Sequence, residues 1–213
     1  MKIAIIGAGK AGGALARASV LAGHSVTVSS KDPSHAEAKA TETGARAVPN
    51  VREALKGAEI IVLAIPYAAL DSFAAENADA LADKVVIDVT NRMSRPNVAN
   101  SVDGTSAAEQ LQAKVPRAKV AKALNYALAV RQADPHIDGL ALDGFVAADD
   151  PEAKEKTLAY VGSLGFRPID AGSLGMARAL EAMAILNMAL QMQNGWPWQT
   201  GWKLLGPTPD QKS

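Results

Sequence analysis

The chain has 213 residues, of which 48% are apolar and 17 are glycine, which suits a soluble domain with a buried core. Lys plus Arg and Asp plus Glu both number 22, so the formal net charge is zero, and no basic stripe suggests a nucleic-acid partner. The lack of cysteine excludes disulfides, thiolate catalysis and cysteine metal sites. The longest apolar run, 60–70, contains Pro66 and falls short of the roughly 20 residues of a membrane helix. We expect a cytoplasmic protein without a membrane partner.

The chain begins with a short apolar strand pattern, 3–6, that leads into Gly7-x-Gly9-x-x-Gly12 and an alanine-rich helix pattern at 10–22. In this setting the glycines allow a tight turn, the approach of a pyrophosphate and close packing of the helix on the strand. The amides at the start of the helix then attract the anion. The motif predicts a dinucleotide site with contacts from Gly7, Ala8, Gly9, Lys10, Ala11 and Gly12.

Strand and helix patterns alternate after this motif. Strands are expected at 25–29, 46–48, 59–65, 84–89 and 120–124, and helices at 33–43, 51–56 and 68–81. Asp32 and Asn50 stand where helix N-caps belong, and Pro33 suits a first helical position. The alternation predicts an α/β fold with a doubly wound parallel sheet of the Rossmann type, whose ligands lie beyond the carboxyl ends of the strands.

The pattern changes after about residue 138. Strands are expected at 140–147 and 166–170, a helix at 151–164 and a long apolar helix at Leu174–Gln193. We predict a Rossmann NADP-binding domain at 1–137, a small α+β carboxyl-terminal lobe at 138–206 for acceptor binding and subunit contact, and a mobile tail at 207–213. Because its apolar residues occupy nearly the whole circumference, the long helix should be covered on several sides and form a homodimer contact.

The end of the second strand distinguishes the two nicotinamide dinucleotides. NAD-selective folds place Asp or Glu there, whereas a 2′-phosphate needs small polar and basic residues. Ser29, Ser30 and Lys31 occupy the position here, which favours NADP(H), with Ser30 donating a hydrogen bond and Lys31 supplying charge. Asp32 is an alternative ribose ligand, although its place before Pro33 favours a cap. A solvent-exposed role for Lys31 also stays open.

Further contacts are expected where the later strands end. The residues there are Ile65, Pro66 and Tyr67, then Thr90 and Asn91, then Leu124, Asn125 and Tyr126. Asn125 is the strongest candidate for a carboxamide or ring-edge hydrogen bond, because an amide both donates and accepts. Each of these residues has the alternative role of closing a loop.

No catalytic acid or base and no metal site are expected. None of the three histidines, His24, His35 and His136, stands beside a strand end with an acidic partner in sequence. Hydride transfer between two bound rings needs reacting atoms at about 3–3.5 Å, and the cofactors carry the reactivity.

Two features of the carboxyl-terminal third stand out. Trp196, Trp198 and Trp202 follow the long helix in a chain that is only 4% aromatic, which indicates a ring-stacking wall or a subunit contact. Arg178 could steady an anionic tail, and an ion pair with Glu181 three residues along the helix is the simpler interpretation.

The sequence as a whole resembles the NADPH:coenzyme F420 oxidoreductases, whose nucleotide domain recurs in the STEAP ferric reductases. The resemblance covers nearly all of the chain and is carried by Gly7–Gly12, Ser29–Lys31 with Ala36–Ala40, Ala64–Pro66, Phe166–Gly172 and, most specifically, Arg178-Ala-Leu-Glu181 with its helix through Asn194. It implies hydride transfer between NADP(H) and a deazaflavin such as coenzyme F420, or a flavin. It also implies that Gly9–Gly12 hold the pyrophosphate, Ser30 and Lys31 the 2′-phosphate, and Ile65-Pro66 the central part of the cofactor.

This sequence departs from the family pattern at two places. Archaeal members carry two arginines where this chain has Lys31-Asp32, which predicts a weaker grip on the 2′-phosphate. They carry His-Thr-Ile-Pro at Asn125–Leu128, the segment that faces the deazaflavin in the family. Reduction of a flavin or of ferric iron therefore stays open.

Two other functions also stay open. An NADP-dependent hydroxyacid, imine or β-hydroxyacid-type dehydrogenase would need a proton donor such as Lys122, but too few residues follow Val130 for the long helical domain of such enzymes. Replacement of Lys122 by Met would abolish turnover in such an enzyme and nearly spare it in hydride transfer between rings. The other is an NADP(H) sensor that holds a partner through the long helix and the tryptophans.

Overall fold

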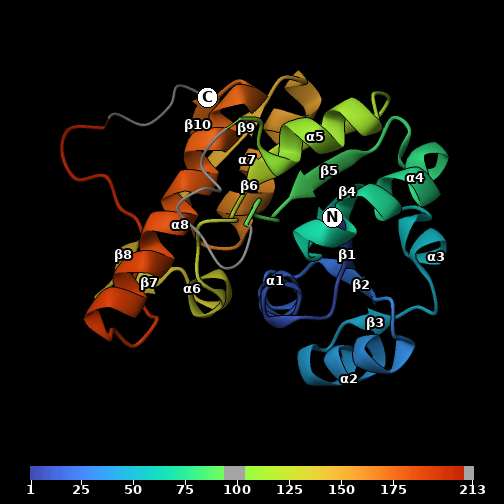
Figure 1. Ribbon diagram of the computed structural model, residues 1–213. Helices are drawn as coiled ribbons and strands as arrows, with labels where there is room; N and C mark the ends of the chain where they lie inside the picture. Colours follow the sequence, from blue (N-terminus) through green and yellow to red (C-terminus); the bar gives the residue numbers. More distant parts are fainter. Residues whose placement is uncertain (94–103, 209–213) are drawn as a thin grey trace.

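The computed structural model describes residues 1–93 and 104–208 (Figure 1). Its main element is a sheet of eight strands. Across the sheet the strand order is β3-β2-β1-β4-β5-β6-β9-β10. Their bounds are β1 Lys2–Ile6, β2 Ser25–Ser29, β3 Arg46–Ala47, β4 Ile60–Leu63, β5 Val85–Asp88, β6 Lys119–Ala123, β9 Asp143–Ala148 and β10 Arg167–Gly172. The strands from β3 to β6 are parallel to one another and follow the Rossmann order, which confirms the predicted fold class.

The strands of the carboxyl-terminal third extend the same sheet. β9 pairs with β6 in the antiparallel direction, with Ala121 opposite Ala148, and β10 pairs with β9 in parallel. A small hairpin of β7 His136–Ile137 and β8 Leu140–Ala141 precedes them, so the single strand predicted at 140–147 is in fact two strands separated at Leu142. The domain boundary predicted at residue 138 falls in the turn of this hairpin and stays a prediction.

Helices cover both faces of the sheet (Figure 1). Their bounds are α1 Lys10–Leu21, α2 Pro33–Thr43, α3 Val51–Leu55, α4 Leu70–Leu81, α5 Ala107–Lys114, α6 Ala129–Ala133, α7 Pro151–Ser163 and α8 Ala177–Asn194, with 3-10 turns η1 Tyr67–Ala69 and η3 Leu174–Met176. Side chains of Asp32 and Asn50 cap α2 and α3 as predicted. Helix α5 is not among the predicted helices, although Ser106 and Glu109 form a capping box at its start.

The core lies in two layers, one on each face of the sheet. Ile3 and Ile5 of β1 pack in the layer that includes α1 and α7, while Ala4 and Ile6 pack in the layer that includes α3, α4 and α5. Alternate residues of one strand thus enter opposite layers, as expected of a parallel strand buried on both faces. A third, smaller cluster joins Tyr126 to Leu180 and Ala184 of α8.

The long helix α8 is only partly covered by its own chain. Leu180, Ala184 and Ile185 are buried, but Leu186 is 49% exposed and Met192 is 59% exposed. The described part of one chain therefore covers only one side of the helix, and the expected cover on several sides stays a prediction. Of the tail predicted at 207–213, residues 209–213 lie outside the described part of the chain. Among the described helices, none is long and apolar enough to span a membrane.

Candidate functional site

Backbone packing explains two of the three motif glycines. Gly7, between β1 and α1, has a φ of 115°, and a Cβ there would lie 2.2 Å from the carbonyl oxygen of Ala64. A Cβ on Gly12 would lie 1.8 Å from the carbonyl oxygen of Gly7. Because backbone atoms cannot yield such space, both positions require glycine for the turn to close on β4.

Gly9 is different, because a Cβ there would meet nothing within 4 Å. It is the N-cap of α1, and no side chain caps this helix. The amides of the first helical turn have no partner within the helix itself and give it a positive end. The space above Gly9 and the uncapped amides together fit a bound pyrophosphate.

A cavity of about 920 Å³ lies over this turn, at the carboxyl ends of β1, β2 and β4. It brings together most of the residues predicted from the motif and from the end of β2. Its lining consists of Gly7, Ala8, Gly9, Lys10, Ala11, Ser30, Lys31, Asp32, Pro33, His35, Ala64, Ile65, Pro66 and Ala69. Gly12 is buried beneath the turn, and Ser29 is fully buried and does not line the cavity.

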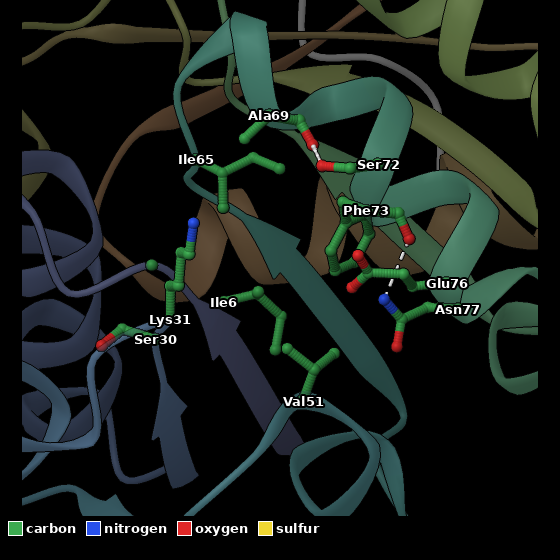
Figure 2. A pocket seen from close by; sticks show the side chains of 11 residues that line it. Ile6, Ser30, Lys31, Val51, Ile65, Ala69, Ser72, Phe73, Glu76 and Asn77 are labelled. Atoms are coloured by element: carbon green, nitrogen blue, oxygen red, sulfur yellow. Dashed lines mark hydrogen bonds between the residues drawn. The ribbon is translucent and has the colours of Figure 1, made fainter.

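A smaller cavity of about 250 Å³ adjoins the first and shares Gly7, Ser30, Lys31, Ile65 and Ala69 with it. Figure 2 shows its apolar wall, formed by Ile6, Val51 and Phe73, with Lys31 at its edge. A cavity with an apolar wall beside the predicted phosphate site suits a nucleobase. Val51 and Phe73 are not among the predicted site residues, because in sequence they resemble ordinary core positions of two helices.

Polar groups at the start of α2 are already engaged with one another. Asp32 accepts hydrogen bonds from the amide and the hydroxyl of Ser34 at 3.0 and 2.8 Å, and these bonds hold the pKa of Asp32 below its usual value. The Ser30 hydroxyl donates to the carbonyl of Asp32, so it must exchange this partner before it can donate to a phosphate. Lys31 is exposed, and His35, which sequence analysis set aside, joins it in the cavity wall.

The residues predicted at the ends of β5 and β6 form a second group, outside the linings of these two cavities. Thr90 donates its hydroxyl to Asp88, and Asn91 and Asn125 exchange two hydrogen bonds of 2.9 and 2.8 Å. Leu124 is fully buried, with a φ of 61°. The turns after β5 and β6 are therefore joined directly through the asparagine pair.

Two tyrosines expected at strand ends have structural partners. Tyr67 donates its hydroxyl to Oε1 of Gln110 at 2.7 Å. The buried hydroxyl of Tyr126 donates to the carbonyl of Asp143 at 3.0 Å and accepts from the amide of Phe145 at 2.6 Å, and burial raises the pKa of Tyr126. Neither tyrosine lines the two cavities above.

The ion pair expected for Arg178 is corrected. Arg178 pairs with Glu109 at 2.6 Å rather than with Glu181, and this guanidinium lowers the pKa of Glu109 to about 2. Glu181 instead binds Lys122 at 2.8 Å, and Lys122 is fully buried between Glu181 and Asp88. An ammonium enclosed by carboxylates does not suit the role of a proton donor to a substrate in open solvent.

Residues 2–92, which hold the glycine turn, the end of β2 and the end of β4, match the family of coenzyme F420-dependent NADP oxidoreductases. The match covers the amino-terminal part of the chain and ends shortly after β5. A solved structure provisionally described as an F420-dependent NADP reductase from Arthrobacter sp. FB24 is 28% identical, with a TM-score of 0.86 over 97% of this chain and 100% of the other. The family and this neighbour confirm the predicted resemblance and the class of NADP-dependent oxidoreductases.

Further proteins are similar to this chain. The rat metalloreductase STEAP3 is 31% identical over 188 residues, which span 86% of this chain and 36% of that protein. A protein from Sinorhizobium meliloti without an assigned function is 27% identical, with a TM-score of 0.74 over 83% of this chain and 88% of the other. An imine reductase from Streptomyces aurantiacus, 18% identical with a TM-score of 0.66, shares the fold.

Proposed function

We propose that the chain transfers a hydride between NADP(H) and a ring-shaped redox acceptor of the deazaflavin or flavin type, such as coenzyme F420. The observation that carries the proposal is the continuous cavity wall from the glycine turn through Lys31 to Ile65 and Pro66, at the edge of a Rossmann sheet. The F420-dependent family match over residues 2–92 favours this acceptor class.

Each part of the chain has a distinct task in this proposal. The uncapped first turn of α1 binds the pyrophosphate, Lys31 binds the 2′-phosphate, and the apolar slot beside Phe73 holds the adenine. Thr90, Asn91, Leu124 and Asn125 hold the nicotinamide end. NADPH, when bound, supplies the hydride. The side chains orient the reacting ring and exclude water, and no side chain transfers a proton.

The acceptor is tested by mixing the protein with NADPH and one acceptor at a time in a single-turnover experiment. We expect fast oxidation of NADPH with a deazaflavin and slower oxidation with FMN. An NADP(H) sensor would bind NADPH and oxidise it with none of the acceptors, and that outcome would contradict the proposed function. The loss of NADPH absorbance is the measurement.

Ferric reduction is the second candidate, favoured by the 31% identity to the rat metalloreductase STEAP3. This chain spans only 36% of that protein, so the activity of the whole relative transfers only as a hypothesis. A ferric chelate added alone and then together with FMN separates direct from flavin-mediated reduction. Reduction of the chelate without flavin would favour this candidate over the first.

Lys31→Ala is expected to reduce the preference for NADPH over NADH about five- to tenfold, because one charge-assisted contact to a phosphate contributes roughly 1–1.5 kcal/mol at a partly exposed site. Affinity for NADH should stay within about twofold. Calorimetric titration with both nucleotides measures the change. Lys56→Ala, which removes an exposed lysine outside the lining of the nucleotide cavity, is the matched control. Equal losses for NADPH and NADH would contradict the assignment of Lys31.

A homodimer through the region Leu174–Gln193 remains part of the proposal. Leu186 and Met192 on α8 and Trp196 just beyond it are large apolar side chains that are exposed in a single chain and that a second copy would cover. Light scattering should give a dimer mass, and Met192→Lys should shift the mass toward the monomer. A monomeric wild-type chain at working concentration would overturn this part of the proposal.

A further inference from the structure

A buried ion cluster lies beneath the turns that follow β5 and β6. Nζ of Lys122 lies 2.8 Å from Oδ2 of Asp88 and 2.8 Å from Oε1 of Glu181, and it also donates to the carbonyl of Thr90. Lys122 and Asp88 have no exposed surface. An ammonium has three N–H donors, and these three acceptors use all of them. Lys122 therefore links these three groups and has no N–H left to donate to a ligand.

Both carboxylates of the cluster also accept hydrogen bonds from other donors. Asp88 accepts from the amide and the hydroxyl of Thr90, while Glu181 accepts from the amide of Arg92 at 3.1 Å and that of Ala107 at 2.8 Å. Ala107 begins α5, so the positive end of that helix offsets the second negative charge. Burying such a cluster gives little net stability, because desolvation opposes the Coulomb attraction. What the cluster does provide is a fixed geometry.

That geometry extends to the asparagine pair. Asn125 donates one amide hydrogen to Oδ1 of Asn91 at 2.8 Å and the other to the carbonyl of Leu180 at 3.0 Å. Leu180 is the neighbour of Glu181 on α8, so the same helix turn supports both the ion cluster and the asparagine. Both donors of Asn125 are used, which fixes the orientation of its amide. Its Oδ1 is buried and has no hydrogen-bond partner within residues 1–93 and 104–208.

We propose that Lys122 is a positioning residue for the nicotinamide. Through Asp88 and Glu181 it fixes the turns after β5 and β6 against α8, so that Asn125 presents its free Oδ1 to an N–H of a ring-bound primary carboxamide. A buried acceptor without a partner is costly, and a carboxamide donor removes that cost only if the acceptor is held in place. This inference rests on the proposed function, and it adds Lys122, which binds no ligand itself.

Calorimetry with two ligands tests the inference. One ligand is NADP⁺, and the other is 2′-phosphoadenosine 5′-diphosphoribose, which lacks the nicotinamide and keeps the rest. We expect Lys122→Met to reduce the preference of the protein for NADP⁺ over this analogue at least tenfold, while affinity for the analogue changes less than about threefold. Asn125→Ala should cause a similar loss. The double variant should lose no more than either single variant, since the two residues act through one contact.

Controls separate positioning from general damage. Arg178→Met breaks the exposed pair with Glu109 one turn earlier on α8 and should leave the ligand preference unchanged. Glu181→Gln carries the same test if Lys122→Met does not fold, with circular dichroism as the check. Equal loss of affinity for both ligands, or additive losses in the double variant, would overturn the inference. A wild-type protein that binds neither ligand would instead refute the proposed function.

Discussion

Gly12→Ala is expected to lower affinity for NADPH at least about 100-fold and to destabilise the fold by about 1–3 kcal/mol. The new methyl carbon would lie 1.8 Å from the carbonyl oxygen and 2.9 Å from the carbonyl carbon of Gly7. Neither atom can move without opening the turn or displacing α1, so the amides that bind the pyrophosphate lose their alignment. Titration calorimetry and thermal denaturation measure the two effects.

Gly9→Ala is the matched comparison, because its methyl group would meet no protein atom within 4 Å. The melting temperature should therefore stay within about 1–2 °C of wild type, while affinity for NADPH still falls, since the methyl group occupies the space that the pyrophosphate enters. If Gly12→Ala bound NADPH normally, the turn would not be the anion site. If Gly9→Ala did so, the nucleotide would not approach Gly9.

The nucleotide-binding half was predictable from sequence because its signals are local. Strand β4 is a continuous apolar run, and Asp32 and Asn50 cap helices that begin one residue later. The glycine spacing also predicts the local geometry, because Gly7 and Gly12 allow close backbone contacts and Gly9 leaves open space. These features depend on residues a few positions apart, and the strand order then follows from the preferred handedness of parallel connections.

The ion pairs were not predictable because their partners are distant in the chain. Arg178 reaches Glu109, 69 residues away, and Lys122 reaches Glu181, 59 residues away. The spacing of Arg178 and Glu181 predicts a pair between them only in an isolated helix. In α8 the half-exposed Arg178 pairs with Glu109, and the buried Glu181 pairs with Lys122. Similarly, the strand predicted at 140–147 divides at Leu142, whose amide bonds to Pro135 rather than to the sheet.

The burial of Lys122 changes the meaning of one substitution. From sequence, a fully active Lys122→Met variant would have excluded a dehydrogenase that uses Lys122 as proton donor. In the structure, removal of the ammonium leaves Asp88 and Glu181 close to each other without their counter-ion, at sites that are 0% and 4% exposed. Loss of turnover is thus expected with either chemistry. A comparison of ligands with and without the nicotinamide measures the positioning effect of Lys122 directly, and turnover alone does not.

Asp143→Ala is expected to destabilise the fold by about 3 kcal/mol, which lowers the melting temperature by about 6–12 °C in a chain of this length. Asp143, fully buried at the start of β9, receives two hydrogen bonds from Arg167 of β10, at 2.7 and 2.8 Å. It also receives Nζ of Lys203 at 3.1 Å and the amide of Leu204 at 2.6 Å. One carboxylate thus joins two strands to the segment that follows α8. Denaturant unfolding measures the loss.

The pH dependence of the stability lost in Asp143→Ala tests whether the charged carboxylate of Asp143 is the source of that stability. Burial alone raises the pKa of Asp143, but hydrogen bonds from Arg167, Leu204 and Lys203 outweigh it and hold the pKa below its usual value. Stability from a depressed pKa is complete above the unfolded value, about 3.9, and disappears as pH falls through the folded value. The difference between wild type and variant should therefore be constant from about pH 7 to pH 5 and shrink below about pH 4.

Arg117→Ala is the control, because its pair with Asp83 is equally short at 2.6 Å while both side chains are more than 70% exposed. Water screens such a pair, so its loss should cost less than about 1 kcal/mol. A similar cost for both variants would mean that the segment after α8 is not anchored by Asp143. A large loss of stability in Asp143→Ala alone would mean that this carboxylate holds the segment after α8 against the start of β9. The buried hydroxyl of Tyr126, just after β6, also donates to the carbonyl of Asp143. The turn that carries Asn125 would then depend on that anchor as well as on Lys122.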